Sequence, residues 1–220
     1  MERIGSKLLT KVLALGFIAT AMSAPSVHAD VSYNIGWASE YHYRGILQKN
    51  SSASAGVDFT EGGFYIGTWA ADVGDGLEID VYGGYGIEVE DFSASLGFTG
   101  YYYTGEFDDT YEEVNLNLGY SWVSVEYSVG TYDNFNGPEQ DYDFLAGTVD
   151  FGDSGFYATY GTFGDDFDGD YIEVGYGVTI SEIDFGVSVI RASDELSDQL
   201  DSSGNPTEGE SLVFTIGKTF

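Results

Sequence analysis

Acidic residues that alternate with apolar ones, joined by one arginine, are the residues of this chain most able to do chemistry. Glu40, His42 and Arg44 occupy every second position of one segment, so in an extended strand they share a face. Other acids stand at alternate positions of later segments: Glu78, Asp80, Glu113, Glu126 and Glu173. On one inner surface, these side chains would form a negatively charged lining that favours cations over anions.

Arg44 is the only basic residue expected on that lining, and it allows two interpretations. It could form a salt bridge that braces the wall at little cost in a wet interior. It could instead stand opposite the acids at a constriction and set a transverse electric field across it. We favour the brace, because so many facing acids need compensation.

His42 is the only histidine after residue 29, which limits catalytic readings. A barrel hydrolase needs a histidine base beside its serine, and no serine stands out as a partner for His42. A zinc site is also poorly supported, because the chain has no cysteine. We therefore predict a polar lining residue, no enzyme activity, no metal site and no cofactor.

The run Asp165–Asp170 contains four further acids and one glycine, which invites a calcium interpretation. It does not fit the EF-hand loop, because the glycine and a distal glutamate do not fall at the required offsets. We favour a solvated acidic loop. An alternative is that divalent ions bridge such loops to the phosphates of lipopolysaccharide.

The composition describes a folded, strongly acidic chain. The 220 residues carry a formal net charge of −30, which argues against nucleic acid as a partner. The 18 Tyr, 15 Phe and 3 Trp indicate a folded protein, since disordered acidic chains have few aromatics. Residues 1–29 combine basic residues, a short apolar run and Val27-His28-Ala29, which predicts a Sec-type signal peptide. Residues 30–220 would then form one domain.

Twelve segments of the remaining chain alternate apolar and polar residues, which is typical of strands with one apolar face. They are residues 31–44, 53–60, 64–71, 77–87, 92–102, 113–120, 123–130, 141–151, 156–163, 172–180, 183–189 and 211–220. Short turns are expected at 61–63, 88–91, 121–122, 152–155 and 181–182. Longer polar loops are expected to begin near residues 45, 72, 104, 133, 164 and 193.

The alternation of long loops with short turns predicts an all-β fold, an antiparallel up-and-down transmembrane β-barrel of twelve strands in the bacterial outer membrane. Both termini would lie on the periplasmic side. Because a carboxylate costs up to a few kcal/mol on the lipid face, the acids should face the interior. Outer-membrane lipids and lipopolysaccharide are the expected surroundings.

The last segment ends on an aromatic residue, Phe220, with Lys218 two positions before it. A barrel must pair its last strand with its first to remove the sheet edge. We therefore expect residues 211–220 to pair antiparallel with residues 31–43, and Phe220 to act as a signal to the barrel-assembly machinery.

Interior width decides what such a barrel can do, because eight strands are filled by side chains and sixteen leave a channel. Inward glycines are expected to make room at residues 84, 86, 97, 119, 130, 175, 177 and 186. This pattern favours a narrow pore for small neutral or cationic solutes. The alternative is a non-conducting structural or surface-interaction barrel.

Three separated motifs resemble those of the TorF-like porins, a group of bacterial outer-membrane proteins. They are Tyr41-His42-Tyr43-Arg44-Gly45, residues 63–70 (GFYIGTWA) and residues 78–85 (EIDVYGGY). The resemblance implies an outer-membrane barrel that passes small solutes, and it supplies no catalytic residues.

Overall fold

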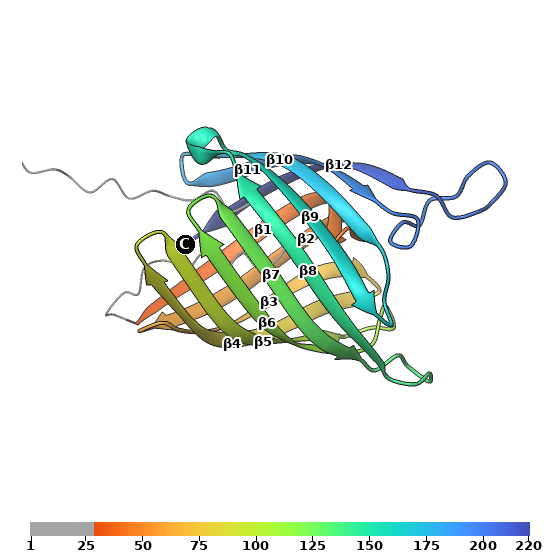
Figure 1. Ribbon diagram of the computed structural model, residues 1–220, viewed down its shortest axis with the longest axis horizontal. Coiled ribbons are helices and arrows are strands. Elements are labelled where there is room, and N and C mark those ends of the chain that lie inside the picture. Colours follow the sequence, from red (N-terminus) through yellow and green to blue (C-terminus); the bar gives the residue numbers. More distant parts are fainter. Residues whose placement is uncertain (1–28) are drawn as a thin grey trace, which may run out of the picture.

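A computed structural model describes residues 29–220 of the chain. Residues 1–28 lie outside the described part, so the signal-peptide prediction is not tested. The chain from Asp30 onward is almost entirely β-structure (Figure 1). Its only helix within residues 29–220 is a 3-10 turn, η1 (Gly152–Ser154), so none there is long and apolar enough to cross a membrane.

Twelve strands follow one another along the chain, as the alternation predicts. The first six are β1 (Asp30–Tyr43), β2 (Ile46–Glu61), β3 (Phe64–Gly74), β4 (Gly76–Val89), β5 (Phe92–Tyr103) and β6 (Tyr111–Tyr120). The last six are β7 (Val123–Tyr132), β8 (Gln140–Asp150), β9 (Phe156–Asp165), β10 (Asp170–Ile180), β11 (Ile183–Ala192) and β12 (Gly209–Thr219).

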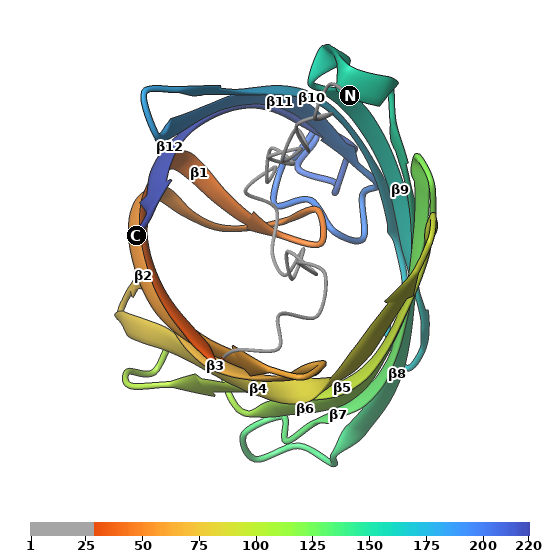
Figure 2. The same ribbon diagram turned by 90° about the vertical axis from the view of Figure 1, so that its left-hand side faces the viewer.

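Each strand pairs antiparallel with its sequence neighbours, and β12 pairs with β1 to close the barrel (Figure 2). The closing ladder runs from Asn34 opposite Thr219 to Ala38 opposite Thr215. Phe220 extends it, because its backbone exchanges two hydrogen bonds with that of Tyr33. The predicted pairing of the first and last strands is therefore confirmed, over a shorter stretch than expected.

The outer surface of the barrel is apolar, as the strand alternation requires. Alternate residues of the strands expose large apolar side chains, for example Ile66 at 57%, Leu96 at 59% and Val174 at 50%. Aromatic residues stand near the end that carries the short turns, where Phe64 packs edge-on against Tyr85 with ring centroids 4.8 Å apart. An apolar band bordered by aromatic residues is the surface that a lipid bilayer requires.

Two of the six loops expected at the other end are instead tight turns. Only Arg44 and Gly45 separate β1 from β2, and only Asp75 separates β3 from β4. The polar stretch from Gln48 to Ser52, expected as a loop, belongs to β2. Polar residues can remain in a strand here, because this part of β2 does not face lipid.

The outer part of the β1–β2 hairpin leaves the barrel wall, and we call residues 39–52 the inner hairpin. The wall ladders end at Ala38 on the β12 side and at Ser54 on the β3 side. Figure 2 shows the hairpin, in orange, crossing the interior of the ring. Its tip lies against the side chain of Tyr171, which belongs to β10, the third strand from β1 around the ring.

Hydroxyl groups replace the backbone ladder where the inner hairpin departs. The Phe214 N–H donates to Ser39 Oγ at 2.8 Å, and Ser52 Oγ donates to the Asp72 carbonyl at 2.7 Å. Ser51 adopts a left-handed backbone with φ of 61°, a conformation that is costly for a residue with a Cβ. These bonds fix the point at which β1 and β2 turn inward.

Aromatic rings occupy much of the room that inward glycines were expected to create. A Cβ on Gly97 would lie 2.2 Å from the Tyr65 hydroxyl, and one on Gly175 would lie 2.3 Å from the Tyr157 ring. Gly130 stands in the same relation to Tyr142, at 2.7 Å. At these positions the prediction of free space is wrong, because a tyrosine one or two strands away fills the space beside the glycine.

Two apolar clusters fill the outer half of the interior, the half near the inner hairpin tip and the longer loops. One contains Tyr142, Phe144, Ala146, Phe163, Tyr171, Ile190, Ala192, Leu196 and Val213. The other contains Tyr41, Ala71 and Val73, with Tyr43, Trp69, Tyr103 and Phe107 packed against it. Tyr41 and Tyr43, expected on the apolar outer face of a wall strand, thus point into the interior because they belong to the inner hairpin.

Candidate functional site

The tip of the inner hairpin carries Arg44 in an unusual backbone conformation. Arg44 and Gly45 have φ of 47° and 86°, the pair of left-handed residues that a type I′ turn needs. Asparagine or aspartate usually stands first in such a turn. A left-handed arginine costs about 1–3 kcal/mol, so contacts of its side chain must compensate for that cost.

Arg44 is buried in a cage formed by three wall strands. Its two terminal nitrogens donate to the two carboxylate oxygens of Glu113, each at 2.9 Å. Nη2 also donates to Glu126 at 2.6 Å and to Ser128 at 3.1 Å. The guanidinium carbon lies 4.1 Å from the centroid of the Phe144 ring. We call Glu113, Glu126, Ser128 and Phe144 the guanidinium cage.

The wall holds the cage in place without help from Arg44. Glu113 accepts hydrogen bonds from Tyr101 at 2.7 Å, Tyr142 at 3.0 Å and Asn115 at 2.7 Å. Asn115 also donates to Ser128 at 3.0 Å. Because these donors lie on β5, β6 and β8 of the wall, they orient the Glu113 carboxylate independently of the hairpin. The site is therefore preorganised for a flat, bidentate cation.

A second pair of buried acids lies on β4, where the inner hairpin contacts the wall. Glu78 is buried and accepts hydrogen bonds from Tyr41 of the hairpin at 2.5 Å and from Tyr103 at 3.0 Å. Asp80, two residues on, is fully buried, and its carboxylate oxygens make no hydrogen bond to any residue in 29–220. A buried carboxylate without a donor or a cation is costly to ionise, which sets Asp80 apart from the hydrogen-bonded acids of the interior.

The other predicted lining residues are separate from the cage. His42 contacts Glu40 at 3.1 Å and the Gly45 carbonyl at 3.4 Å, within the hairpin itself. It also borders a small cavity with Leu47, beneath the segment that joins β11 to β12. Glu173 accepts a hydrogen bond from Tyr157 at 2.5 Å. Of the eight predicted residues, the structure thus joins Arg44, Glu113 and Glu126 in the cage, and it joins His42 to Glu40 within the hairpin.

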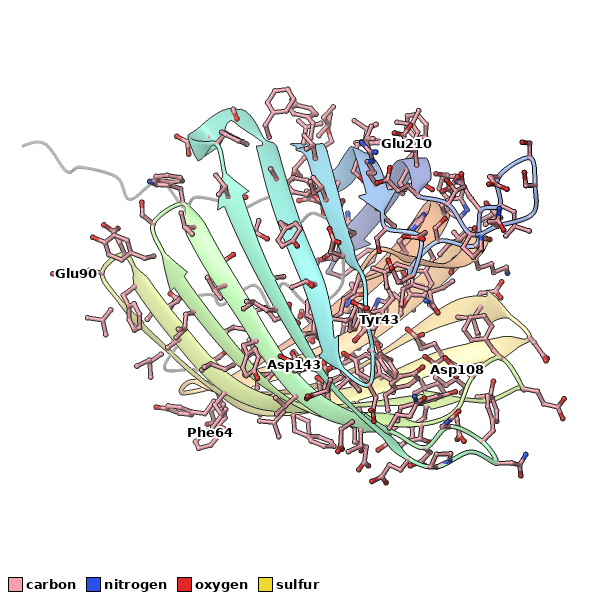
Figure 3. The ribbon with its side chains drawn as sticks, turned by 45° about the vertical axis from the view of Figure 1, so that its right-hand side comes forward. Tyr43, Phe64, Glu90, Asp108, Asp143 and Glu210 are labelled. Atoms are coloured by element: carbon pink, nitrogen blue, oxygen red, sulfur yellow. The ribbon has the colours of Figure 1, made fainter. Side chains whose placement is uncertain are left out.

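Tyrosines are the interior residues that sequence reasoning missed. Three of the interior acids named above, Glu78, Glu113 and Glu173, accept a hydrogen bond from a tyrosine hydroxyl. Tyr82 donates in the same way to Asp58 at 2.5 Å. Near the outer end, Asp108 accepts from Tyr111 at 2.9 Å and Tyr132 at 2.7 Å. A usable signal existed, because Tyr82 falls on the same strand face as two acids of β4, and Tyr101 falls on the same face as Ser95 and Thr99 of β5. Figure 3 shows Tyr43 inside the barrel and Phe64 outside it.

The acidic run at residues 165–170 forms the connection between β9 and β10. Asp166 accepts a hydrogen bond from the Asp141 backbone at 3.2 Å, and Asp168 accepts one from Gly169 at 2.8 Å. Phe167 turns inward and stacks on Tyr142, with centroids 5.1 Å apart. Within residues 29–220, no group of three or more acidic or histidine side chains is arranged to hold a metal ion.

Comparison with known proteins gives one family match. The family described as "Bacterial protein of unknown function (Gcw_chp)" matches residues 21–190. No curated protein matches the chain. The resemblance to TorF-like porins is not reproduced by this match and stays a prediction.

Several solved structures share the barrel. One, described as "Unveiling the Mechanism Behind the in-meso Crystallization of Membrane Proteins", has a TM-score of 0.54 at 10% identity, over 88% of this chain and 83% of that one. OprD from Pseudomonas aeruginosa has a TM-score of 0.43 at 12% identity, over 87% of this chain and 65% of OprD. OpdK from the same organism, with vanillate, has a TM-score of 0.40 at 14% identity, over 79% of this chain and 58% of OpdK. The first likeness supports the fold alone.

Proposed function

The chain belongs to the Gcw_chp family of bacterial proteins, and we propose that it forms an outer-membrane channel of the porin type. The channel admits small neutral or cationic solutes through an acidic lumen. The observation that carries this proposal is a closed barrel whose outer face is apolar and whose inner face holds carboxylates. Such a surface is stable only in a lipid bilayer, where an acid-lined interior offers the one polar path.

Interior charge supports a preference for cations. The inward acids of the wall outnumber the single inward arginine of residues 29–220, which is paired with Glu113 and Glu126. Rings of negative charge favour cations. The test is single-channel recording of purified protein in a planar bilayer under a salt gradient. We expect small conductance steps and a cation-selective reversal potential; silence or anion selectivity would contradict the proposal.

A non-conducting structural barrel is the second candidate, favoured by the packed outer half. If the inner hairpin is a permanent plug, no solute passes it. The two candidates can be separated with cysteines, because the natural chain has none. A Cβ on Gly45 would lie 2.7 Å from that of Tyr171, so cysteines there need only a small shift to form a disulfide.

The Gly45→Cys/Tyr171→Cys variant should be closed when oxidised and conducting when reduced, if solutes pass beside a mobile hairpin. The single variant Tyr171→Cys, treated in the same way, controls for effects of the reductant. Lack of conductance in both redox states, with wild-type protein also silent, would favour the structural barrel.

Location and assembly are part of the same proposal. The apolar outer face fits outer-membrane lipids, with lipopolysaccharide facing the longer loops. Phe220, whose backbone pairs with Tyr33, would present the closing strand to the assembly machinery. Deletion of Phe220 should lower the amount of heat-modifiable barrel in outer-membrane fractions. Normal levels would contradict this role.

We assign no catalytic role to the interior. The two ring nitrogens of His42 face Glu40 and the Gly45 carbonyl rather than a serine hydroxyl. A nucleophile needs its base within hydrogen-bond reach. Hydrolysis of small esters by purified protein, abolished by His42→Ala, would contradict this assignment.

A further inference from the structure

The guanidinium cage belongs to the barrel wall, whereas its occupant belongs to a segment that has left the wall. Glu113, Glu126 and Phe144 lie on β6, β7 and β8. Arg44 comes from the far side of the barrel, at the end of a hairpin held at its base by Ser39 and Ser52. Site and occupant therefore belong to separate structural units, and Arg44 joins them at the hairpin tip.

The cage has the features of a recognition site for one chemical group. Glu113 matches the fork of a guanidinium with two parallel hydrogen bonds, and Glu126 adds a third contact at 2.6 Å. The Phe144 ring supplies an aromatic face at 4.1 Å. Two carboxylates surround one guanidinium, so the cage carries more negative charge than its occupant neutralises. Tyr101, Tyr142 and Asn115 keep Glu113 oriented.

We propose that the guanidinium cage is a binding site for small solutes that carry a guanidinium group, and that Arg44 occupies it as a tethered competitor. The inference rests on the proposed channel function and deepens it by naming a solute class. A solute that enters the cage displaces Arg44, releases the hairpin tip and widens the path. Arg44 therefore acts as a latch that opens preferentially for solutes of its own chemistry.

The strain of the turn supports this arrangement. Arg44 has a left-handed backbone, and the hydrogen bonds of its side chain offset that cost while the latch is closed. When the guanidinium leaves the cage, the turn keeps its strain and loses the compensation. The released tip is therefore less stable than the closed latch, and Arg44 returns to the cage once the solute has left.

The test is rescue of an emptied cage by free guanidinium ion. Arg44→Ala removes the occupant and leaves Glu113 buried. Thermal midpoints are measured by heat modifiability in detergent, with millimolar guanidinium chloride or the same concentration of sodium chloride. We expect guanidinium to raise the midpoint of Arg44→Ala by about 2–4 °C over sodium. Wild-type protein should respond much less at the same concentration, because Arg44 competes for the site.

Two further variants make the result specific. Arg44→Ala/Glu113→Gln should lose the response, and Arg191→Ala, which removes an arginine of an exposed ion pair with Glu208, should behave as wild type. Arg44→Met keeps most of the stem against Phe144 and replaces Arg44→Ala if the latter does not fold. An equal response to sodium, or an unchanged response in the double variant, would overturn the proposal.

Bilayer recording separates this proposal from the channel function. Arg44→Ala should conduct more than wild type, and guanidinium should reduce its current where methylammonium does not. If no variant conducts but the thermal response is present, the channel function fails and the cage stands. If variants conduct but neither the current nor the midpoint responds to guanidinium, the cage fails and the channel function stands.

Discussion

The two halves of the barrel interior are built from the same strands but in different ways. The outer half holds the inner hairpin, two aromatic clusters and the buried pair of Arg44 and Glu113. The inner half, toward the termini and the short turns, has many small polar residues beside Tyr65 and Tyr157: Ser93, Asn117, Ser124, Thr148, Thr159 and Thr215. Its side-chain hydrogen bonds include one between the hydroxyl groups of Thr148 and Thr159, which lie 2.8 Å apart.

This difference separates two tasks that a single interior must perform. Small hydroxyl side chains fill less of the interior than packed rings do, and they carry little folding energy. Packed tyrosines and a buried ion pair give the outer half a defined shape, but they block it. Control of passage therefore lies in the outer half, and the inner half contributes mainly a polar wall.

Removing the inner hairpin should have the largest effect. Replacing residues 39–51 by Asn-Gly would close β1 and β2 at the pair of Ala38 and Ser52. We expect conductance to rise several-fold, because the segment that crosses the interior is gone. Single-channel recording measures the change, and a truncation of residues 134–138 in the β7–β8 loop is the control. Equal conductance in all three proteins would show that the outer half does not limit flow.

Breaking the buried ion pair should have the next largest effect. Arg44→Ala leaves Glu113 charged and buried, and removal of one partner of such a pair costs about 3–5 kcal/mol. Arg44→Met/Glu113→Gln should recover most of the loss, because neither charge remains. Urea unfolding followed by fluorescence measures the free energies. Simple addition of the two single-variant effects would mean that the pair is not coupled.

A matched change in the inner half should have a small effect. Thr148→Val removes one hydroxyl from the pair with Thr159 and keeps the shape of the side chain. Because water can replace the lost partner, we expect a cost below about 1 kcal/mol and unchanged conductance. A cost as large as that of Arg44→Ala, by the same urea method, would remove the distinction between the halves.

The smallest effect is expected in the outer loop that joins β11 to β12. Asp201 accepts hydrogen bonds from the backbone N–H groups of Ser203 and Asn205, and these bonds lower the pKa of its carboxyl group. Because the folded pKa is lowered, the ionised carboxylate stabilises the loop at pH values above the unfolded pKa of about 3.9. This stabilisation is lost as the pH falls through the folded pKa. Pepsin cleavage of the loop should rise with acidity in wild type. Asp201→Asn should be cleaved similarly throughout, and conductance should not change.

Much of the fold could be predicted, because strand alternation is a local property of the sequence. Outward residues such as Ile66 and Leu96 follow from period two, and closure follows from the need to pair Phe220 and its neighbours. The cost of burying charge in lipid predicts that the acids lie on the inner face. These arguments need no knowledge of distant contacts.

The inner hairpin could not be predicted in the same way. A strand that leaves the wall keeps its alternation, so Tyr41 and Tyr43 retain the pattern of outward residues although they point inward. Its departure depends on contacts between residues far apart in sequence, such as Arg44 with Glu113. One local signal was available: Arg44-Gly45 stands in a turn that normally begins with Asn or Asp.

The two-residue turn at the hairpin tip also affects how fast the hairpin can be released. Arg44 belongs to a two-residue turn rather than to a long loop, so its backbone cannot move independently of the two strands that it joins. Release of its side chain must therefore move the whole arm about its base at Ser39 and Ser51. Such collective motions take microseconds to milliseconds or longer. We expect the current to switch between discrete levels with measurable dwell times, rather than to vary smoothly.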